Sequence, residues 1–227
     1  MIVAATGLQR ERRIVAGPGI EAVAGGGDHA RLEAVLDRLA VGARGIISIG
    51  IAGGLAPGLQ VGHWVVANAV LVDDESPPTD PAWTDRLAAR LPGASRGLVL
   101  GADAMVADAT QKALLHRTTG AVVVDMESHV VARVARRHGL PFAVARVVSD
   151  AAHRTLPPAA RVGMKSDGGM DLPAVLRSLL AHPGQLPALI RTGLDAEQGL
   201  RALLRGHRRL GVRLCGPDLG DPLLDMA

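Results

Sequence analysis

The sequence predicts an α/β fold in which a central mixed, largely parallel sheet lies between two layers of helices, as a three-layer α/β/α sandwich. Short apolar runs rich in Val and Ile alternate with amphipathic segments, a pattern typical of strands joined by helices. The chain has 227 residues, of which 48% are hydrophobic, enough to bury the core of one α/β domain. We therefore expect residues 1–227 to form a single domain.

The clearest unit is the segment 121–152. Residues 121–124 and 142–148 are apolar, largely β-branched runs that predict buried parallel strands. The segment between them has an apolar helical face and a positively charged last turn, and it ends at Gly139 and Pro141. This segment is therefore a strand, helix, strand unit.

Polar residues follow both strands of this unit. In open α/β sheets ligands bind beyond the carboxyl ends of the strands. The residues that fall there are Asp125, Glu127, Ser149 and Asp150. One interpretation is structural, with Glu127 capping a helix and Asp150 capping the next turn. The other is that these groups converge on a ligand.

The chain before this unit begins with strands. Residues 1–6 are an apolar strand, followed by a loop or short helix. Residues 20–27 are a strand ending in three glycines, after which Asp28 can cap a helix. Residues 45–55 form a buried strand that ends in a glycine-rich turn, and another strand, 64–72, follows directly. Because no helix follows those glycines, they do not match a dinucleotide-binding fingerprint.

The other elements follow from periodicity and from Pro and Gly positions. Before the 121–152 unit, we expect a helix over 81–91, a strand in the first part of 97–106 and a helix over 110–119. After it, we expect a long loop over 151–171, two basic amphipathic helices over 172–210 and an irregular tail over 211–227. Breaks in the helical pair are expected at Pro183 and Pro187. The pair can lie on an anionic membrane surface or pack on the sheet with a solvated basic face.

Composition excludes several classes of protein. The chain has one Phe, two Trp and no Tyr, so it lacks the aromatic platforms on which nucleic-acid bases stack, and no nucleic-acid partner is expected. No HExxH, CxxC or paired-His spacing occurs among the eight histidines, so no metal is predicted. The lone Cys215 fits a reducing compartment. With no signal peptide and no membrane-spanning run in the sequence, we expect a cytoplasmic protein.

Two sequence words carry a resemblance to a known family. VDMESH, over 124–129, and RVVSDAA, over 146–152, resemble the signature of the nucleoside phosphorylase and nucleosidase superfamily, and GIAGGLAPGLQVGHWVV, over 50–66, resembles its glycine-rich block. The resemblance implies a purine nucleoside phosphorylase-like fold and cleavage of an N-glycosidic bond. It also suggests a homodimer or a higher homo-oligomer.

The resemblance assigns roles residue by residue. It implies that Asp150 is the acid at the purine N7, that Glu127 holds the ribose hydroxyls and that Glu11 orients the attacking water. Met105 would lie against the purine and the Val106 backbone would meet its edge. The remaining members of the implied substrate-binding set are Met126 and Ser149.

Phosphate is a candidate co-substrate, and no other cofactor is expected. The turn ending at Gly27, with Arg31 in the next helical turn, can bind an anion. Ser48 and the amides near Gly50 can add donors. However, Ile51 occupies the place of a Ser in many relatives, which weakens the case for phosphate. Water and phosphate both remain candidate nucleophiles, and the local arginines favour phosphorolysis.

The chain is most similar to the hopanoid-biosynthesis-associated branch of this superfamily. That branch implies release of adenine from adenosylhopane, a nucleoside with a polycyclic lipid on its 5′ carbon, and contact with the inner membrane periphery. One alternative is a methylthioadenosine/S-adenosylhomocysteine nucleosidase. An alternative of another class is a noncatalytic nucleoside- or lipid-binding protein.

Overall fold

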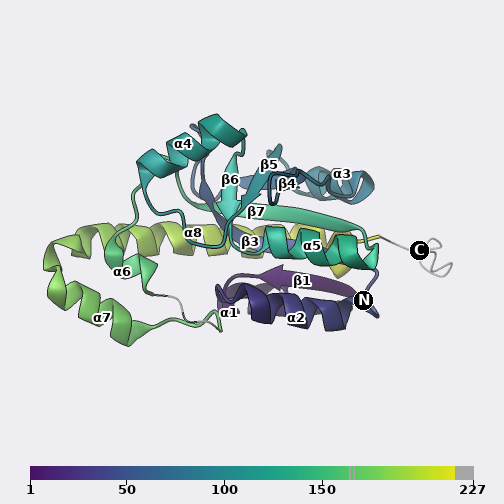
Figure 1. Cartoon of the computed structure of the whole chain (residues 1–227), viewed down its shortest axis with the longest axis horizontal. Coiled ribbons are helices and arrows are strands. Elements are labelled where there is room, and N and C mark those ends of the chain that lie inside the picture. The colour runs from purple at the N-terminus through teal and green to yellow at the C-terminus, as the bar shows by residue number, and fades with distance from the viewer. Residues whose placement is uncertain (164, 166, 218–227) are drawn as a thin grey trace.

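A computed structural model of the chain describes residues 1–163, 165 and 167–217 (Figure 1). The strands are β1 (Ile2–Thr6), β2 (Ile20–Ala24), β3 (Gly45–Gly54), β4 (Trp64–Leu71), β5 (Ser95–Gly101), β6 (Val123–Asp125) and β7 (Phe142–Asp150). The α-helices are α1 (Gln9–Val15), α2 (His29–Ala40), α3 (Pro81–Arg90), α4 (Ala109–Thr119), α5 (Ser128–His138), α6 (Pro158–Arg161), α7 (Leu172–Ala181) and α8 (Leu186–Leu210). Two short 3₁₀ segments are η1 (Pro183–Gln185) and η2 (Val212–Cys215).

The seven strands form one mixed sheet, in the order β2-β1-β3-β6-β5-β4-β7. The pairs β3–β6 and β4–β7 are antiparallel and the other strand pairs are parallel, which confirms a mixed, largely parallel sheet. β3 also pairs with β7, so β3, β7, β4, β5 and β6 close into a ring that β1 and β2 extend. The sequence did not predict this closure, because it depends on pairing between strands far apart in the chain.

Helices cover both faces of the sheet (Figure 1), as the alternation in β1 requires. Val3 and Ala5 point into the core shared with α2 and α5. Ile2 and Ala4 point into the opposite core, where residues of α1, α3 and α8 pack. The predicted layered α/β architecture is therefore confirmed.

The C-terminal helices differ in detail from expectation. The helical pair is confirmed as α7 and α8, with the break at η1. Pro187 lies in the first turn of α8, where a missing N–H costs nothing, so it does not break the helix. The segment 151–171 contains the short helix α6, and residues 218–227 of the tail lie outside the described part.

The second half of α8 packs on the sheet, whereas its first half extends with α6 and α7 as an arm (Figure 1). A Cβ at Gly206 would lie 2.3 Å from the Trp64 ring, so only glycine allows this close packing of α8. In the described part of the chain, no helix is both long enough and apolar enough to cross a bilayer.

Candidate functional site

A buried guanidinium from β7 lies beside β3 and the end of β6. Arg146 of β7 is fully buried, and its Nε lies 2.7 Å from Asp125 Oδ2. Its Nη2 lies 3.2 Å from Glu127 Oε2 and donates a short hydrogen bond to Ser48 Oγ. One cation thus links the middle of β7 to the middle of β3 through Ser48 and to the end of β6 through Asp125.

Glu11 of α1 belongs to the same cluster. Its Oε2 accepts from the Leu8 amide at 2.6 Å, and its Oε1 accepts from the Ile51 amide at 2.6 Å. A Cβ at Gly50 would lie 2.6 Å from Glu11 Oε1 and 2.9 Å from Arg146 Nη1. Glycine at position 50 therefore provides the space in which the Glu11 carboxylate meets the guanidinium.

Burial and mutual repulsion shift the protonation of these acids. Burial raises the pKa of Glu127 to about 8, against the attraction of Arg146, and the neighbouring Asp125 and Glu11 carboxylates add to the rise. Burial also raises the pKa of Glu11, while Arg146 and backbone amides oppose the shift. With three carboxylates around one guanidinium, Glu127 holds a proton at neutral pH.

This shift predicts a pH dependence of stability. The usual pKa of a glutamate is 4.5 and that of folded Glu127 is about 8. The raised pKa of Glu127 contributes to the free energy of unfolding in full below about pH 4.5, and this contribution is lost as the pH rises through 8. The reason is that, between these pH values, the folded chain retains a proton on Glu127 that the unfolded chain has released. In urea titrations between these pH values, the free energy of unfolding should fall more steeply in the wild type than in Glu127→Gln.

The exposed Glu21 of β2 provides the control. Glu21→Gln should keep the wild-type slope. Identical slopes in the wild type and Glu127→Gln would show that Glu127 is ionised throughout this range.

Glu127 occupies the N-cap position of α5, as the structural interpretation expected, but its side chain does not cap the helix. Asp125 Oδ1 accepts from the amides of Glu127 at 3.0 Å and of Ser128 at 2.8 Å, so Asp125 caps α5. The Glu127 side chain makes no capping hydrogen bond to α5 and contacts Arg146 instead.

Asp150, at the end of β7, is held by side chains. Its Oδ2 forms an ion pair with Lys112 Nζ, and its Oδ1 accepts from Ser149 Oγ at 2.9 Å. Lys112 is fully buried and also donates to the Arg154 carbonyl at 3.0 Å. The proposed acid therefore has a buried ammonium as its partner, which distinguishes it from a simple turn cap.

A β-bulge sets the direction of Asp150. Ala52 of β3 pairs with Val148, but Gly53 pairs with Asp150, so Ser149 is the extra residue on β7. A Cβ at Gly53 would lie 3.4 Å from Asp150 Oδ2. Two residues of β3 thus face the two groups of charges: the Ile51 amide donates to Glu11, and Gly53, two positions later, lies against Asp150.

Two cavities lie near the end of β7, one of them lined by Asp150. One of about 290 Å³ lies between Asp150 and α8, with Arg154, Arg191 and Thr192 in its wall. Another of about 420 Å³ lies between the Leu55–Gln60 segment and α4. His153 borders both.

The implied substrate-binding residues occupy different environments. Val106 is buried against Leu55, Ala121 and Val124, whereas Met105 is 38% exposed. Met126 is half-buried in the short link between β6 and α5. Their predicted contacts with a purine stay predictions.

The four predicted phosphate-binding residues lie in two neighbouring segments, and the turn after β2 meets the buried cluster at Gly25, where a Cβ would lie 3.2 Å from Glu127 Cγ. Ser48 and Gly50 lie in the buried cluster, where Ser48 Oγ contacts Arg146 and Ser128. Arg31 Nη2 donates to the carbonyls of Ala24 at 2.6 Å and Gly25 at 2.9 Å, and Gly27 lies in the same turn with a positive φ of 76°. Arg31 therefore stabilises the turn after β2 through hydrogen bonds to its backbone carbonyls.

The sequence did not predict three features of the site. These are the ion pair of Lys112 with Asp150, the capping of α5 by Asp125, and the contacts of Arg146 with Asp125 and Glu127. One signal for Lys112 was available: it is one of two lysines in an arginine-rich chain and lies in a predicted helix. It is the only buried residue of α4. Arg146 interrupts an otherwise apolar strand, and an unpaired charge in such a strand would be costly.

Comparisons with known proteins agree with this geometry. The futalosine hydrolase of Streptomyces coelicolor is 36% identical over 124 residues, which are 46% of this chain and 53% of that protein. The chain therefore matches about half the length of this relative.

Solved structures share the fold at low sequence identity. The S-adenosylhomocysteine nucleosidase of Streptococcus pyogenes superposes with a TM-score of 0.60 at 18% identity, over 93% of this chain and 97% of that one. The futalosine hydrolase of Helicobacter pylori gives a TM-score of 0.59 at 16% identity, over 91% and 96% of the two chains. The family model described as the phosphorylase superfamily matches residues 5–181, and this chain belongs to that superfamily.

Proposed function

We propose that this protein hydrolyses the N-glycosidic bond of a 5′-modified adenosine and releases adenine. The observation that carries the proposal is the pairing of two charge clusters along the end of β3, with Glu11, Glu127 and Arg146 at one and Asp150 and Lys112 at the other. Gly50 and Gly53 are three residues apart, which spans roughly 10 Å of strand. We assign the ribose to this span, with the nucleophile on one side and the base on the other.

The reaction needs a proton donor and a nucleophile. Asp150 would donate a proton to the purine N7 as the bond from C1′ to N9 breaks and its electrons pass to the base, and the Lys112 ammonium would stabilise the carboxylate that remains. Water would attack C1′ and give a proton to Glu11. General acid catalysis of this kind contributes about 10² to 10⁴ in rate, or roughly 3 to 5.5 kcal/mol of barrier.

Glu127 would bind the ribose hydroxyls. With its pKa raised to about 8, Glu127 is mainly the neutral acid at neutral pH, so it can donate one hydrogen bond to a ribose hydroxyl and accept another. Its ionised form, which gains population as the pH approaches 8, would place negative charge near the developing ribosyl cation. Arg146 sets the orientation of this carboxylate, at 3.2 Å from Oε2.

Charge favours water over phosphate. The buried cluster already has three acidic side chains around one guanidinium, and a phosphate dianion would add negative charge to it. The cations expected to offset it are engaged elsewhere: Arg31 donates to backbone carbonyls, and Arg10 pairs with Glu197 at 2.9 Å. We therefore propose hydrolysis, in place of the phosphorolysis that the arginines of the sequence favoured.

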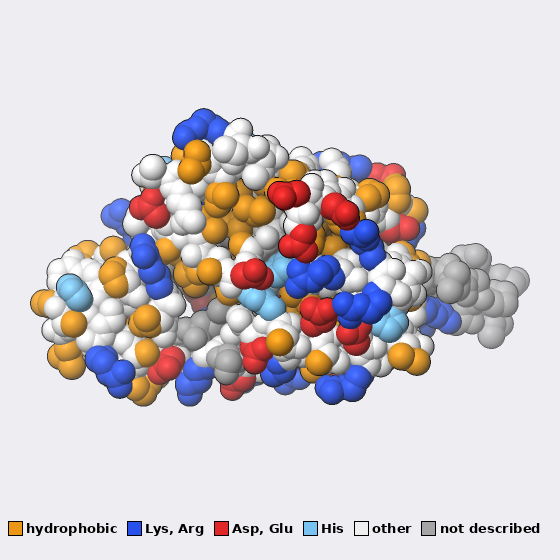
Figure 2. Space-filling view, viewed as in Figure 1, with side chains coloured by type: hydrophobic (Ala, Val, Ile, Leu, Met, Phe, Trp, Pro, Cys, Tyr) orange, Lys and Arg blue, Asp and Glu red, His pale blue; other side chains and the backbone are white. Residues whose placement is uncertain are grey.

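The arm supports a lipid as the 5′ substituent. Its α8 segment provides Arg191 and Thr192 to the cavity at Asp150. Hydrophobic side chains are spread over the surface of the same arm (Figure 2). The exposed ones are Met170, Leu172, Leu176, Leu180, Leu186, Ile190 and Leu194. An apolar arm beside the site suits a polycyclic lipid such as that of adenosylhopane, presented at a membrane surface or within a homo-oligomer.

The test is adenine release from adenosylhopane in detergent micelles, with methylthioadenosine and S-adenosylhomocysteine as competitors. We expect the highest kcat/KM for the adenosyl lipid, the same rate with and without phosphate, and a free sugar as product. Arg31→Ala should leave the rate unchanged. A phosphate requirement with a sugar 1-phosphate as product would overturn hydrolysis.

A nucleosidase for small 5′ substituents is the second candidate, favoured by the fold shared with a nucleosidase of known structure. It predicts faster turnover of methylthioadenosine than of the adenosyl lipid. Binding of adenine nucleosides without any adenine release would instead support a noncatalytic protein.

A further inference from the structure

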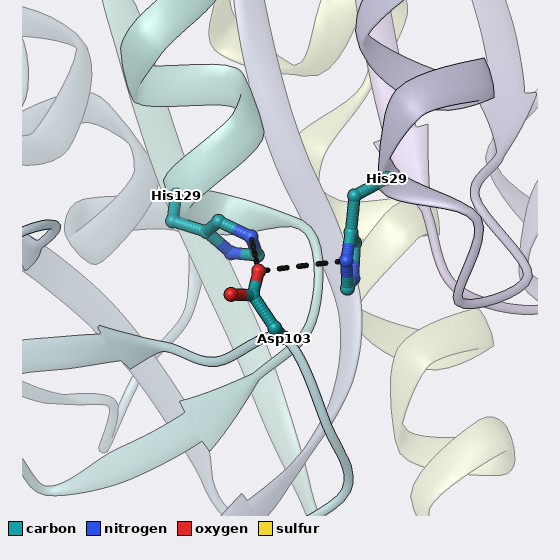
Figure 3. A group of neighbouring side chains, drawn as sticks. All are labelled: His29, Asp103 and His129. Atoms are coloured by element: carbon teal, nitrogen blue, oxygen red, sulfur yellow. Dashed lines mark hydrogen bonds and ion pairs between the residues drawn. The ribbon is translucent and has the colours of Figure 1, made fainter.

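Two histidines and an aspartate outside the proposed mechanism converge at one point (Figure 3). His29 is the first residue of α2, His129 is the second residue of α5, and Asp103 lies in the loop after β5. Asp103 Oδ1 lies 3.1 Å from His129 Nε2 and 3.5 Å from His29 Nδ1. The imidazole rings meet edge to face, with centroids 5.0 Å apart and an interplanar angle of 71°.

These separations suit a bound cation. One ligand atom from each residue can be chosen so that all three lie within 4.8 Å of one another. Tetrahedral coordination with bonds of about 2.0–2.1 Å separates ligand atoms by roughly 3.3–3.4 Å, which lies between the two measured distances. Two imidazoles and one carboxylate are ligands that Zn²⁺ and neighbouring transition metals accept.

The backbone around the three residues is well anchored. Asp28 caps α2 by accepting from the Arg31 amide at 2.9 Å, and Asp125 caps α5. A Cβ at Gly101 would lie 2.3 Å from His129 Cβ, so the end of β5 lies directly against the first turn of α5. The ligand atoms are therefore held by two helix starts and a strand end.

The histidines are suited to metal binding. His129 is buried, so packing fixes the position of its imidazole ring. The Asp103 side chain is 85% exposed, which leaves the remaining coordination positions open to water. Histidine side chains reach the surface beside acidic ones near the starts of α2 and α5 (Figure 2).

We propose that His29, Asp103 and His129 form a site for one divalent transition metal ion, with Zn²⁺ as the best fit. Water or an anionic group would fill the open positions. The ion would tie together the segments after β2, β5 and β6, and the third of these contains Glu127. The residues are so far apart in the sequence that no metal motif marks them.

The affinity should be moderate. His29 Nε2 and His129 Nδ1 are buried with no hydrogen-bond partner among the described residues. In established sites these second nitrogens donate to a carboxylate or carbonyl, and losing that partner costs about 10–100-fold in affinity. We therefore expect weaker binding than at a site of the same ligands with full outer-shell support.

The experiment uses the full chain without an affinity tag, stripped of metal with a chelator. Titration with Co²⁺, followed by its visible absorption, and competition between Zn²⁺ and a chromophoric chelator should both give one equivalent per chain. Saturating Zn²⁺ should raise Tm in a concentration-dependent way.

Asp103→Asn is the main variant, because Asp103 is exposed and the change is isosteric. It should weaken Zn²⁺ binding by at least about 10-fold, as should His29→Asn. The exposed His182 of the arm supplies the control, since His182→Asn should bind like the wild type. Absence of stoichiometric binding, or equal affinity in Asp103→Asn and His182→Asn, would overturn the site. Neither result depends on the hydrolase activity.

Discussion

Asp150→Asn is expected to lower kcat for adenine release by about 10² to 10⁴, with little change in nucleoside binding. An amide can donate a hydrogen bond to N7 but cannot transfer an acidic proton, so it retains recognition and loses catalysis. Single-turnover measurement of adenine release, beside the equilibrium binding of a nonhydrolysable nucleoside, separates the two effects.

The variant leaves Lys112 as an unpaired buried ammonium, which costs about 3–5 kcal/mol of stability. The matched control is therefore the double variant Asp150→Asn with Lys112→Met, which removes both charges. It should recover most of the stability and none of the activity. Turnover near that of the wild type in the single variant would remove Asp150 from the role of acid.

Arg146→Met is expected to destabilise the protein by about 3–5 kcal/mol, because removal of one partner leaves buried charge without compensation. The carboxylates of Glu11, Asp125 and Glu127 lose their shared cation. Since protonation relieves their repulsion, the loss should be smaller at acid pH and larger above the pKa of Glu127, about 8. Urea unfolding of the wild type and the variant measures the loss of stability, and repeating it at about pH 5.5 and about pH 8.5 measures how that loss depends on pH.

The exposed Arg208 of α8 provides the comparison. Arg208→Met should change stability by no more than about 0.5 kcal/mol at either pH. If Arg146→Met were equally mild, the buried cluster would not be an ionic network.

Local sequence signals predicted much of the fold. The strand, helix, strand unit over 121–152 became β6, α5 and β7, because valine runs and the Gly139 stop act over a few residues. The expectation that its two strands run parallel was wrong, because β3 pairs antiparallel with β6 and parallel with β7. The same signals placed Glu127 and Asp150 at strand ends, and the structure has both side chains there, engaged by Arg146 and Lys112. Their roles toward a nucleoside stay predictions.

The sequence by itself determined the α/β class, the order of most elements and the acids at the strand ends, because hydrophobic period, capping and turn chemistry are local. Only the tertiary structure decided which charges are partners. Arg146 meets Asp125 across 21 positions and Lys112 meets Asp150 across 38, and both pairs form because strand register and helix packing bring the residues together. His29, Asp103 and His129 likewise converge only when α2, β5 and α5 pack side by side, since no periodicity in the chain encodes contacts over such separations.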